Sequence, residues 1–209
     1  MAKRASKVLN VILNVLLVIA LIITAYFIFY TCTHFTSNVQ GPSMIPTFNN
    51  ESGEEDRVLV SKIASYTYGD IVILRVEEEG SQSAKDIIKR VYAFGGDSID
   101  MVFENHNLTI YVNGNIVEEK QYESPIYYEE APLAYVNFCV LKEHWKGEGG
   151  GTSAIVLPAD TIFVIGDNRE KSSDSTLNGP YDKSCVQAKV LTKIDKNSFA
   201  PFELIKYWL

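Results

Sequence analysis

One apolar segment, residues 8–30, constrains this chain more than any other feature. It carries no charged side chain and only two asparagines, Asn10 and Asn14. At ~1.5 Å per residue, a helix of this length spans about 34 Å, enough to cross a ~30 Å hydrocarbon core. A cleaved signal peptide has a shorter apolar core of about 7–15 residues before a small-x-small site, and neither is present here. Bulky residues precede Cys32, whereas small residues precede a lipoprotein cysteine. We therefore expect an uncleaved transmembrane anchor.

The charges beside this anchor predict its orientation. Residues 1–7 hold Lys3, Arg4 and Lys7 and no acid. The positive-inside rule then places residues 1–7 in the cytoplasm and residues 31–209 outside a plasma membrane that the chain crosses once. The whole chain has a net charge of −7, so the residues after the first seven carry −10 (−7 minus +3). Such an acidic body argues against nucleic acid as a partner, because phosphate binding needs clustered cationic side chains.

Residues 31–209 are expected to form one mostly β domain. Short runs rich in β-branched and aromatic residues alternate with Gly, Asp and Asn turns, and the sequence Asn113-Gly-Asn predicts a hairpin turn. The expected strands are 57–62, 70–76, 86–92, 108–112 and 161–165. No stretch beyond the anchor shows a long 3.6-residue apolar period. Residues 101–157, which include the glycine-rich segment 147–151, carry no catalytic motif, and we expect them to form an inserted accessory β-lobe.

The cysteines predict neither a metal site nor a disulfide framework. There are three of them, Cys32, Cys139 and Cys185, and they are widely spaced. A single Cys139–Cys185 bridge outside the cell stays open as an alternative.

Ser43 and Lys89 are the candidate reactive residues. Ser43 lies in the sequence Gly-Pro-Ser-Met-Ile-Pro-Thr shortly after the anchor, and Lys89 lies in an apolar run that is typical of a strand. A serine needs a base to accept its proton as it attacks a carbonyl, and histidine is the usual base. The three histidines, His34, His106 and His144, lie in no motif-like setting and are expected at the surface.

Lysine can replace histidine as the base only when its amine is neutral near pH 7. Because the ordinary lysine pKa is ~10.4, burial among apolar groups is needed to lower it. Alternate residues of a strand share a face, so Lys89 should point into the core with Ile87 and Val91 while Arg90 points to water. Burying an unpaired cation is costly, which makes this position unusual unless the lysine has a function. The alternative is that Lys89 lies at a strand edge and extends to solvent.

Four sequence blocks, in this order, resemble those of the bacterial type I signal peptidases, which are membrane-anchored serine proteases with a Ser/Lys dyad. The blocks are 41–47, 69–73, 89–97 and 166–175. The resemblance implies a β-rich catalytic fold that removes N-terminal signal peptides from exported preproteins, with no metal or cofactor. It assigns Ser43 as the nucleophile and Lys89 as the general base. It also implies an enzyme that faces the lipid bilayer, contacts the secretion machinery and accepts small residues in an Ala-x-Ala-like pattern.

The same resemblance assigns supporting roles to the last block. Ser172 would hydrogen-bond the Lys89 amine and aim it. The supporting network would consist of Asp167, Asn168, Arg169 and Asp174. The Gly-Asp-Asn sequence of this block also favours a structural turn in any protein, and both interpretations can hold together.

Some positions depart from the family pattern. Gly41 stands where some relatives carry a serine whose hydroxyl helps to hold the oxyanion, so the backbone N–H of Ser43 would act with another donor. Met44 is expected to line the substrate pocket together with Ile45. Thr176 stands where the family usually has an arginine.

Two other classes of protein compete with the peptidase interpretation. A non-catalytic, peptidase-like assembly factor, for example one that serves surface pili, would keep the fold but tends to lose the serine or the lysine. A self-cleaving Ser/Lys regulator would carry a DNA-binding domain and work in the cytosol. The presence of both Ser43 and Lys89 argues against the first, and the anchor and the acidic body argue against the second.

Overall fold

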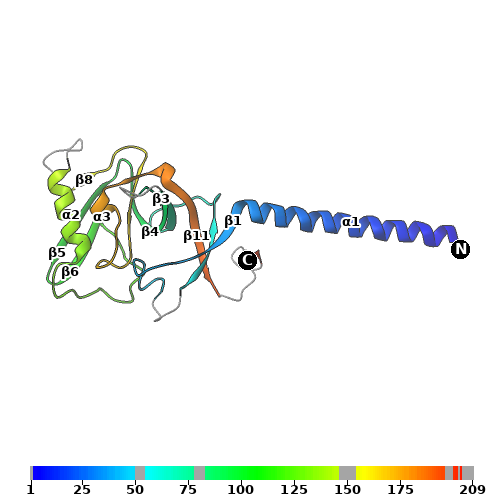
Figure 1. Cartoon of the computed structure of the whole chain (residues 1–209), viewed down its shortest axis with the longest axis horizontal. Coiled ribbons are helices and arrows are strands. Elements are labelled where there is room, and N and C mark those ends of the chain that lie inside the picture. The colour runs from blue at the N-terminus through cyan, green and yellow to red at the C-terminus, as the bar shows by residue number, and fades with distance from the viewer. Residues whose placement is uncertain are drawn as a thin grey trace.

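A computed structural model describes residues 2–49, 55–77, 83–145, 154–195, 200, 201 and 203. The glycine-rich segment 147–151 lies outside the described residues. The longest element is α1 (Ala2–Thr33), a helix that extends away from the remainder of the chain (Figure 1). Among the described helices, α1 alone is long and apolar enough, over Lys7–Thr33, to cross a membrane by length and composition. A single apolar helix of this kind is consistent with a single-pass membrane protein.

In the described part of the chain, the larger of two sheets has seven antiparallel strands in the order β1-β2-β11-β3-β4-β9-β10. The strands are β1 (His34–Asn38), β2 (Arg57–Ser61), β3 (Ile71–Val76), β4 (Lys85–Phe94), β9 (Thr161–Ile165), β10 (Tyr181–Asp182) and β11 (Val186–Ile194). β4 pairs with β3 from Lys85 to Arg90 but with β9 only from Arg90 to Phe94. The second edge of β4 before Arg90 therefore has no partner strand in the part of the chain that the structure describes. β1, which directly follows α1, is an edge strand of the same sheet.

The smaller sheet forms the accessory lobe. Its strands, in the order β7-β6-β5-β8, are β5 (Ser98–Glu104), β6 (Asn107–Val112), β7 (Asn115–Ile116) and β8 (Ile155–Val156). The predicted hairpin turn is confirmed, because Asn113 and Gly114 join β6 to β7 with φ of +52° and +75°. The mostly β fold with an accessory β-lobe is thus confirmed, and the first strand of the lobe begins at Ser98.

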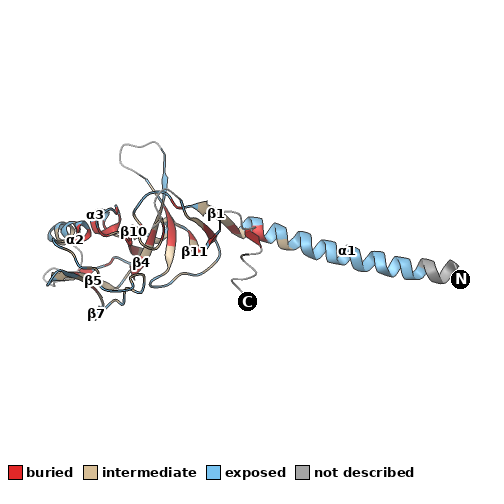
Figure 2. Ribbon diagram, turned by 90° about the horizontal axis from the view of Figure 1, so that it is seen from below, coloured by how far each residue is buried: buried red, intermediate tan, exposed pale blue. Residues whose placement is uncertain are grey.

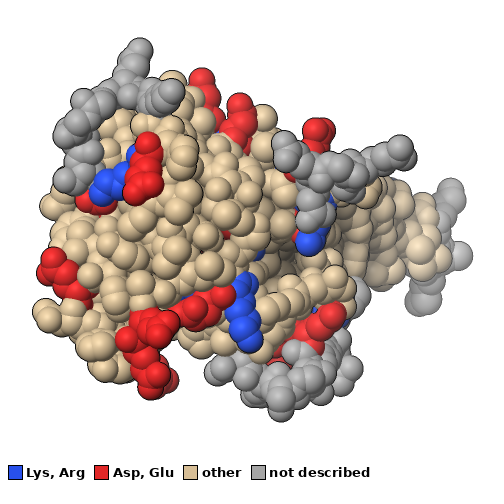
Figure 3. Space-filling model, turned by 60° about the vertical axis from the view of Figure 1, so that its left-hand side comes forward, with Lys and Arg blue, Asp and Glu red and all other residues tan. Residues whose placement is uncertain are grey.

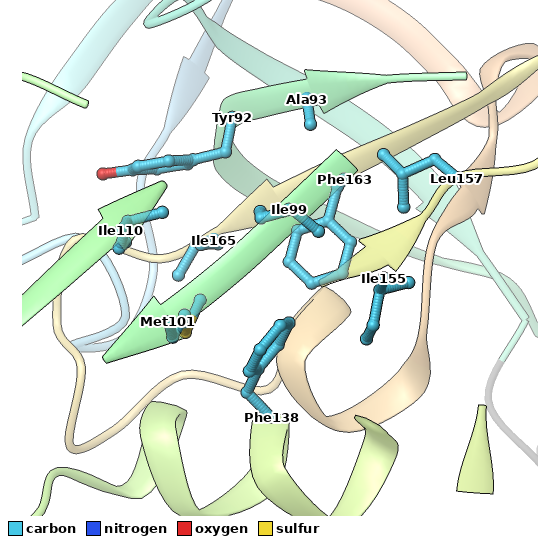
Figure 4. Close-up of a cluster of buried hydrophobic side chains, with 10 residues drawn as sticks. All are labelled: Tyr92, Ala93, Ile99, Met101, Ile110, Phe138, Ile155, Leu157, Phe163 and Ile165. Carbon is cyan, nitrogen blue, oxygen red and sulfur yellow. The ribbon is translucent and has the colours of Figure 1, made fainter. Parts of the chain in front are cut away.

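One helix in this lobe, α2 (Leu133–His144), was not predicted from the sequence. Its Phe138 side chain is fully buried and packs edge-on against Phe163 of β9, in the core beside the two sheets (Figure 4). The apolar period of α2 is weak because Leu133 and Val136 leave apolar side chains exposed on its outer face. Packing against the sheets therefore decides this helix more than its local pattern does.

Two further short elements are the helix α3 (Ser175–Asn178) and the 3-10 turn η1 (Lys183–Cys185). All three cysteines are free, so the Cys139–Cys185 bridge is not formed.

Candidate active site

The side chains of Ser43 and Lys89 meet in this fold. Lys89 Nζ donates a hydrogen bond to Ser43 Oγ over 3.0 Å and another to the Ile88 carbonyl over 2.8 Å. Ser43 lies in the turns that follow β1, and Lys89 lies in β4 opposite Val72 of β3. Only 4% of Lys89 is exposed, so its predicted inward orientation is correct. The alternative prediction, that Lys89 extends to solvent from a strand edge, is wrong. The structure thus places a buried amine against a serine hydroxyl.

Burial lowers the pKa of Lys89 from 10.5 to about 8, because a charged amine loses its hydration there. The Asp174 and Asp167 carboxylates oppose that shift, while the Lys85 ammonium adds to it. At pH 8 about half of the Lys89 amines are therefore neutral, whereas an exposed lysine would be almost fully charged. Only the neutral amine can accept a proton from Ser43.

Hydrogen bonds and packing hold the turn that carries Ser43. Asn168 donates from its backbone N–H to the Ser43 carbonyl and from Nδ2 to the Pro42 carbonyl, each over 3.0 Å. Met44 is fully buried in a cluster with apolar side chains of β2 and β11. Met44 therefore anchors the turn in the core. The hydrogen bonds from Asn168 and the packing of Met44 together hold the turn that positions Ser43.

Gly41 has a conformational reason to be glycine. Its φ is +79°, in the left-handed region where a side chain is strained, although a Cβ would meet no atom within 4 Å. The Gly41 carbonyl accepts a hydrogen bond from Asn49 Nδ2 over 3.0 Å, which stabilises this backbone turn. The glycine therefore serves the path of the chain into Ser43.

Asp167 is a buried carboxylate that Arg90 neutralises. The Arg90 guanidinium donates from Nε to Oδ1 over 2.8 Å and from Nη2 to Oδ2 over 2.6 Å, and the Thr47 hydroxyl also donates to Oδ2. Arg90 was expected to point to water, and that prediction is wrong, because only 15% of its side chain is exposed. A carboxylate buried as deeply as Asp167 needs a cationic partner. Arg90 and Thr47 are therefore site residues that sequence reasoning missed.

Asp174 is fully buried and caps α3. Its Oδ1 accepts hydrogen bonds from the Thr176 N–H over 3.0 Å and the Thr176 hydroxyl over 2.8 Å, and its Oδ2 accepts one from the Gly166 N–H over 2.8 Å. Thr176 thus contacts this carboxylate with two neutral donors at the position where the family pattern has an arginine. With threonine at position 176, the turn between β9 and α3 is therefore still stabilised by hydrogen bonds to the Asp174 carboxylate.

Ser172 lies next to Gly166, and its buried hydroxyl has no hydrogen-bond partner among the described residues. The hydrogen bond expected between Ser172 and the Lys89 amine is therefore not formed in this structure. A Cβ on Gly166 would lie 2.1 Å from Ser172 Oγ and 2.6 Å from the Ser43 carbonyl oxygen. The absence of a side chain at Gly166 is what lets these two segments approach.

Arg169 lies in the core behind this turn, with 2% of its surface exposed. It donates to the Tyr92 hydroxyl over 2.7 Å and to the Gly166 carbonyl, and it forms an ion pair with Glu119. Its guanidinium also lies over the rings of Tyr92 and Tyr122. Sequence reasoning missed Glu119 and Tyr122 as partners of Arg169, because both belong to the accessory lobe, which carries no motif. Arg169 therefore joins the lobe to the last sequence block.

A groove of about 820 Å³ leads to Ser43 and Lys89. Residues 36–43 and residues 85–89 line it, together with Val58, Ile73 and Ser173. One side is thus the end of β1 with the chain that continues from it, and the other is the part of β4 that has a free edge. An extended peptide in this groove can pair its backbone with such an edge.

The histidines do not join this site. His34 was expected at the surface, which is wrong, because it is 5% exposed and stacks on the Tyr30 ring at the end of α1. His106 and His144 are exposed. No group of three or more His, Cys, Asp or Glu side chains among the described residues could hold a metal ion. On the face shown in Figure 3, the coloured Lys and Arg side chains form no continuous basic surface.

Known proteins similar to this chain are signal peptidases. Residues 9–194 match the family model described as signal peptidase, peptidase S26. The chain is 33% identical over 175 residues to signal peptidase I P of Bacillus subtilis subsp. natto, covering 81% of this chain and 78% of that protein. It is 26% identical over 169 residues to signal peptidase IB of Staphylococcus aureus (strain MRSA252), covering 81% and 79%. A crystal structure of a signal peptidase I from Enterococcus faecalis V583 aligns with 62% of this chain and 99% of that chain, at 21% identity and a TM-score of 0.37. The chain therefore belongs to the signal peptidase family, peptidase S26.

Proposed function

We propose that this protein is a membrane-bound serine endopeptidase that removes N-terminal signal peptides from exported preproteins. The observation that carries the proposal is the 3.0 Å hydrogen bond between the buried Lys89 amine and the Ser43 hydroxyl. Neutral Lys89 takes the Ser43 proton as Oγ attacks the scissile carbonyl. The Lys89 ammonium then gives its proton to the departing amine, which leaves an ester acyl-enzyme on Ser43. Lys89, neutral again, activates the water that hydrolyses this ester.

The negative oxygen of the tetrahedral intermediate needs hydrogen-bond donors near Ser43. Gly41 offers no hydroxyl, so the backbone N–H of Ser43 acts with a second donor. Ser172 serves as a positioning residue through its packing, because it lies against Gly166 in the turn that contacts Ser43. The network around Asp167, Asn168, Arg169 and Asp174 holds that turn.

The preprotein enters as an extended strand along the groove between residues 36–43 and 85–89. The free edge of β4 offers its backbone groups, and the residues before the cut are small, in an Ala-x-Ala-like pattern. Since β1 directly follows α1, the groove begins close to the end of the anchor. A signal peptide that stays in the lipid bilayer can therefore reach Ser43.

The charge pattern of the sequence supports one orientation. Lys3, Arg4 and Lys7 keep residues 1–7 in the cytoplasm, and residues 31–209 then lie on the outer side of the plasma membrane. In that place the enzyme meets preproteins as the secretion machinery delivers them.

Cleavage of a preprotein with an Ala-x-Ala site by the detergent-solubilised full chain tests this proposal. Ser43→Ala and Lys89→Ala should each lose at least ~10³-fold in kcat. The matched control is Lys62→Ala, because Lys62 is exposed and lies outside the groove, and it should keep native activity. The rate of the native chain should rise with pH around a midpoint near 8, where Lys89 becomes neutral.

Two results would contradict the proposal in different ways. A folded native chain that cleaves none of several preproteins would favour a non-catalytic assembly factor. A Lys89→Ala variant that keeps its activity would mean that another group is the base.

A further inference from the structure

The membrane-spanning part of α1 gathers its asparagines and its threonine in one stripe. Residues 10, 14, 17, 21, 24 and 28 follow the alternating four- and three-residue spacing of a helix–helix seam, and they are Asn10, Asn14, Leu17, Leu21, Thr24 and Ile28. On a helix of 3.6 residues per turn these positions lie within about 80° of one another. They include every Asn and Thr of segment 8–30. The two amides and the threonine hydroxyl of this segment therefore face one direction, whereas the hydroxyls of Tyr26 and Tyr30 lie on the other side of the helix.

Nothing else in the described chain covers this stripe. From residue 7 to residue 29, α1 extends away from both sheets in two perpendicular views and its surface is almost entirely exposed, and only at its end does Tyr30 pack against Leu59 and Ile194 (Figures 1 and 2). Thr24 bonds to the Ala20 carbonyl of its own helix over 2.8 Å. Asn10 and Asn14 are exposed, and neither amide has a hydrogen-bond partner in the part of the chain that the structure describes.

Asn14 lies too deep in the bilayer for water to satisfy it. The middle of segment 8–30 is residue 19, so Asn14 is about 7.5 Å from the middle of the membrane along the helix axis. The hydrocarbon core extends ~15 Å to either side, and acyl chains offer no hydrogen-bond partner there. Asn10 lies about 13.5 Å from the middle, near the head groups. Asn14 is therefore the residue that most needs a partner within the membrane.

We propose that α1 pairs in parallel with the α1 helix of a second copy of this chain through the stripe that runs from Asn10 to Ile28. An amide is both donor and acceptor, so the Asn14 side chains of two copies satisfy each other across a symmetric interface. The spacing of the stripe is that of the left-handed helix pairs common in membranes. The apolar core of a signal peptide is a poorer partner, because it offers Asn14 no polar side chain.

Cys32 provides a native reporter of this pairing. It is exposed near the outer end of α1, eighteen residues or five turns after Asn14, and thus on the same side of the helix. The full chain, reconstituted in phosphatidylethanolamine–phosphatidylglycerol vesicles and oxidised mildly with copper–phenanthroline, should form a disulfide-linked dimer. Cys32→Ser should remove that dimer, which identifies the bond.

The decisive comparison is between Asn14→Leu and Ile19→Leu. Asn14→Leu should weaken self-association about tenfold at matched protein-to-lipid ratio, whereas Ile19→Leu, on the opposite side of α1, should leave it unchanged. Both variants should cleave a preprotein in detergent at the native rate, which shows that the domain outside the membrane is folded.

Three results would overturn the proposal. One is a native dimer yield no higher than that of Cys32→Ser, and another is an equal yield for Asn14→Leu and the native chain. Either would mean that the stripe faces lipid or another membrane protein. The third is a native dimer yield that falls to the Asn14→Leu yield when a preprotein is present before oxidation, which would assign the stripe to the signal peptide.

Discussion

Replacing Lys89 by methionine tests the burial of its amine through protein stability. Methionine keeps an unbranched side chain of similar length and removes the charge. Folding lowers the pKa of Lys89 from 10.5 to about 8. Because each pKa unit corresponds to ~1.4 kcal/mol, a charged Lys89 destabilises the folded state by on the order of 3 kcal/mol. The Lys89→Met variant has no charge to bury, so its folded state lacks this destabilisation.

The pH dependence separates this penalty from every other effect of the substitution. Below pH 8, Lys89 is charged in the folded and the unfolded chain, and the penalty is present in full. Between pH 8 and 10.5 the unfolded chain binds a proton that the folded chain does not, so the native free energy of unfolding rises with pH. Above pH 10.5 both states are neutral. The advantage of Lys89→Met should therefore shrink by on the order of 3 kcal/mol from pH 7 to pH 10.5. Loss of the hydrogen bonds of the Lys89 amine also changes the free energy of unfolding of Lys89→Met, but by an amount that does not depend on pH.

Urea unfolding of the detergent-solubilised full chain measures this difference. Trp145 packs against the core around Phe138, so its fluorescence reports on unfolding of that core. Lys62→Met is the matched control, since Lys62 is exposed and should show no pH-dependent difference from the native chain. A constant gap between the native chain and Lys89→Met from pH 7 to pH 10 would refute the reasoning, and with it the case for Lys89 as a neutral base.

Three further substitutions probe the turn behind the dyad. Arg90→Leu leaves the buried Asp167 carboxylate unpaired and should lower the free energy of unfolding by about 3–5 kcal/mol in urea; a loss below 1 kcal/mol would contradict this. Gly166→Ala forces a Cβ into Ser172 and the Ser43 backbone and should lower kcat by ~10²-fold, so a native kcat would disprove the close approach. Ser172→Ala removes a buried hydroxyl that has no hydrogen-bond partner among the described residues, so it should raise the free energy of unfolding by up to ~1 kcal/mol and leave the midpoint of the pH–rate profile unchanged. A shifted midpoint would mean that the Ser172 hydroxyl bonds the Lys89 amine during the reaction.

Local signals in the sequence predicted local structure correctly. The Asn113-Gly114 turn forms because both residues tolerate the positive φ that a tight hairpin requires. The inward direction of Lys89 follows from strand alternation, which holds wherever one face is buried. Arg90, by the same rule, lies on the opposite face, but the rule does not say what covers that face. In this fold Asp167 lies there, so the arginine is buried as well.

Two of the misses, the helix α2 and the partner of Arg169, share one cause. The helix at Leu133–His144 has no clean apolar period of its own and exists because Phe138 fills the core beside Phe163. Glu119 belongs to no motif, and it matters because it neutralises Arg169. In both cases the decisive contact joins residues that lie far apart in the sequence, which no window of neighbouring residues contains.

The sequence by itself determined the apolar helix, the mostly β character and the four blocks that resemble signal peptidases, because length, alternation and turn chemistry act between neighbours. Only the tertiary structure decided that Ser43 and Lys89, 46 residues apart, lie 3.0 Å from each other. It also decided the lowered pKa of Lys89 and the pairing of Arg90 with Asp167. Desolvation and charge pairing depend on what the rest of the chain packs against each side chain, and that is known only once the sheets are assembled.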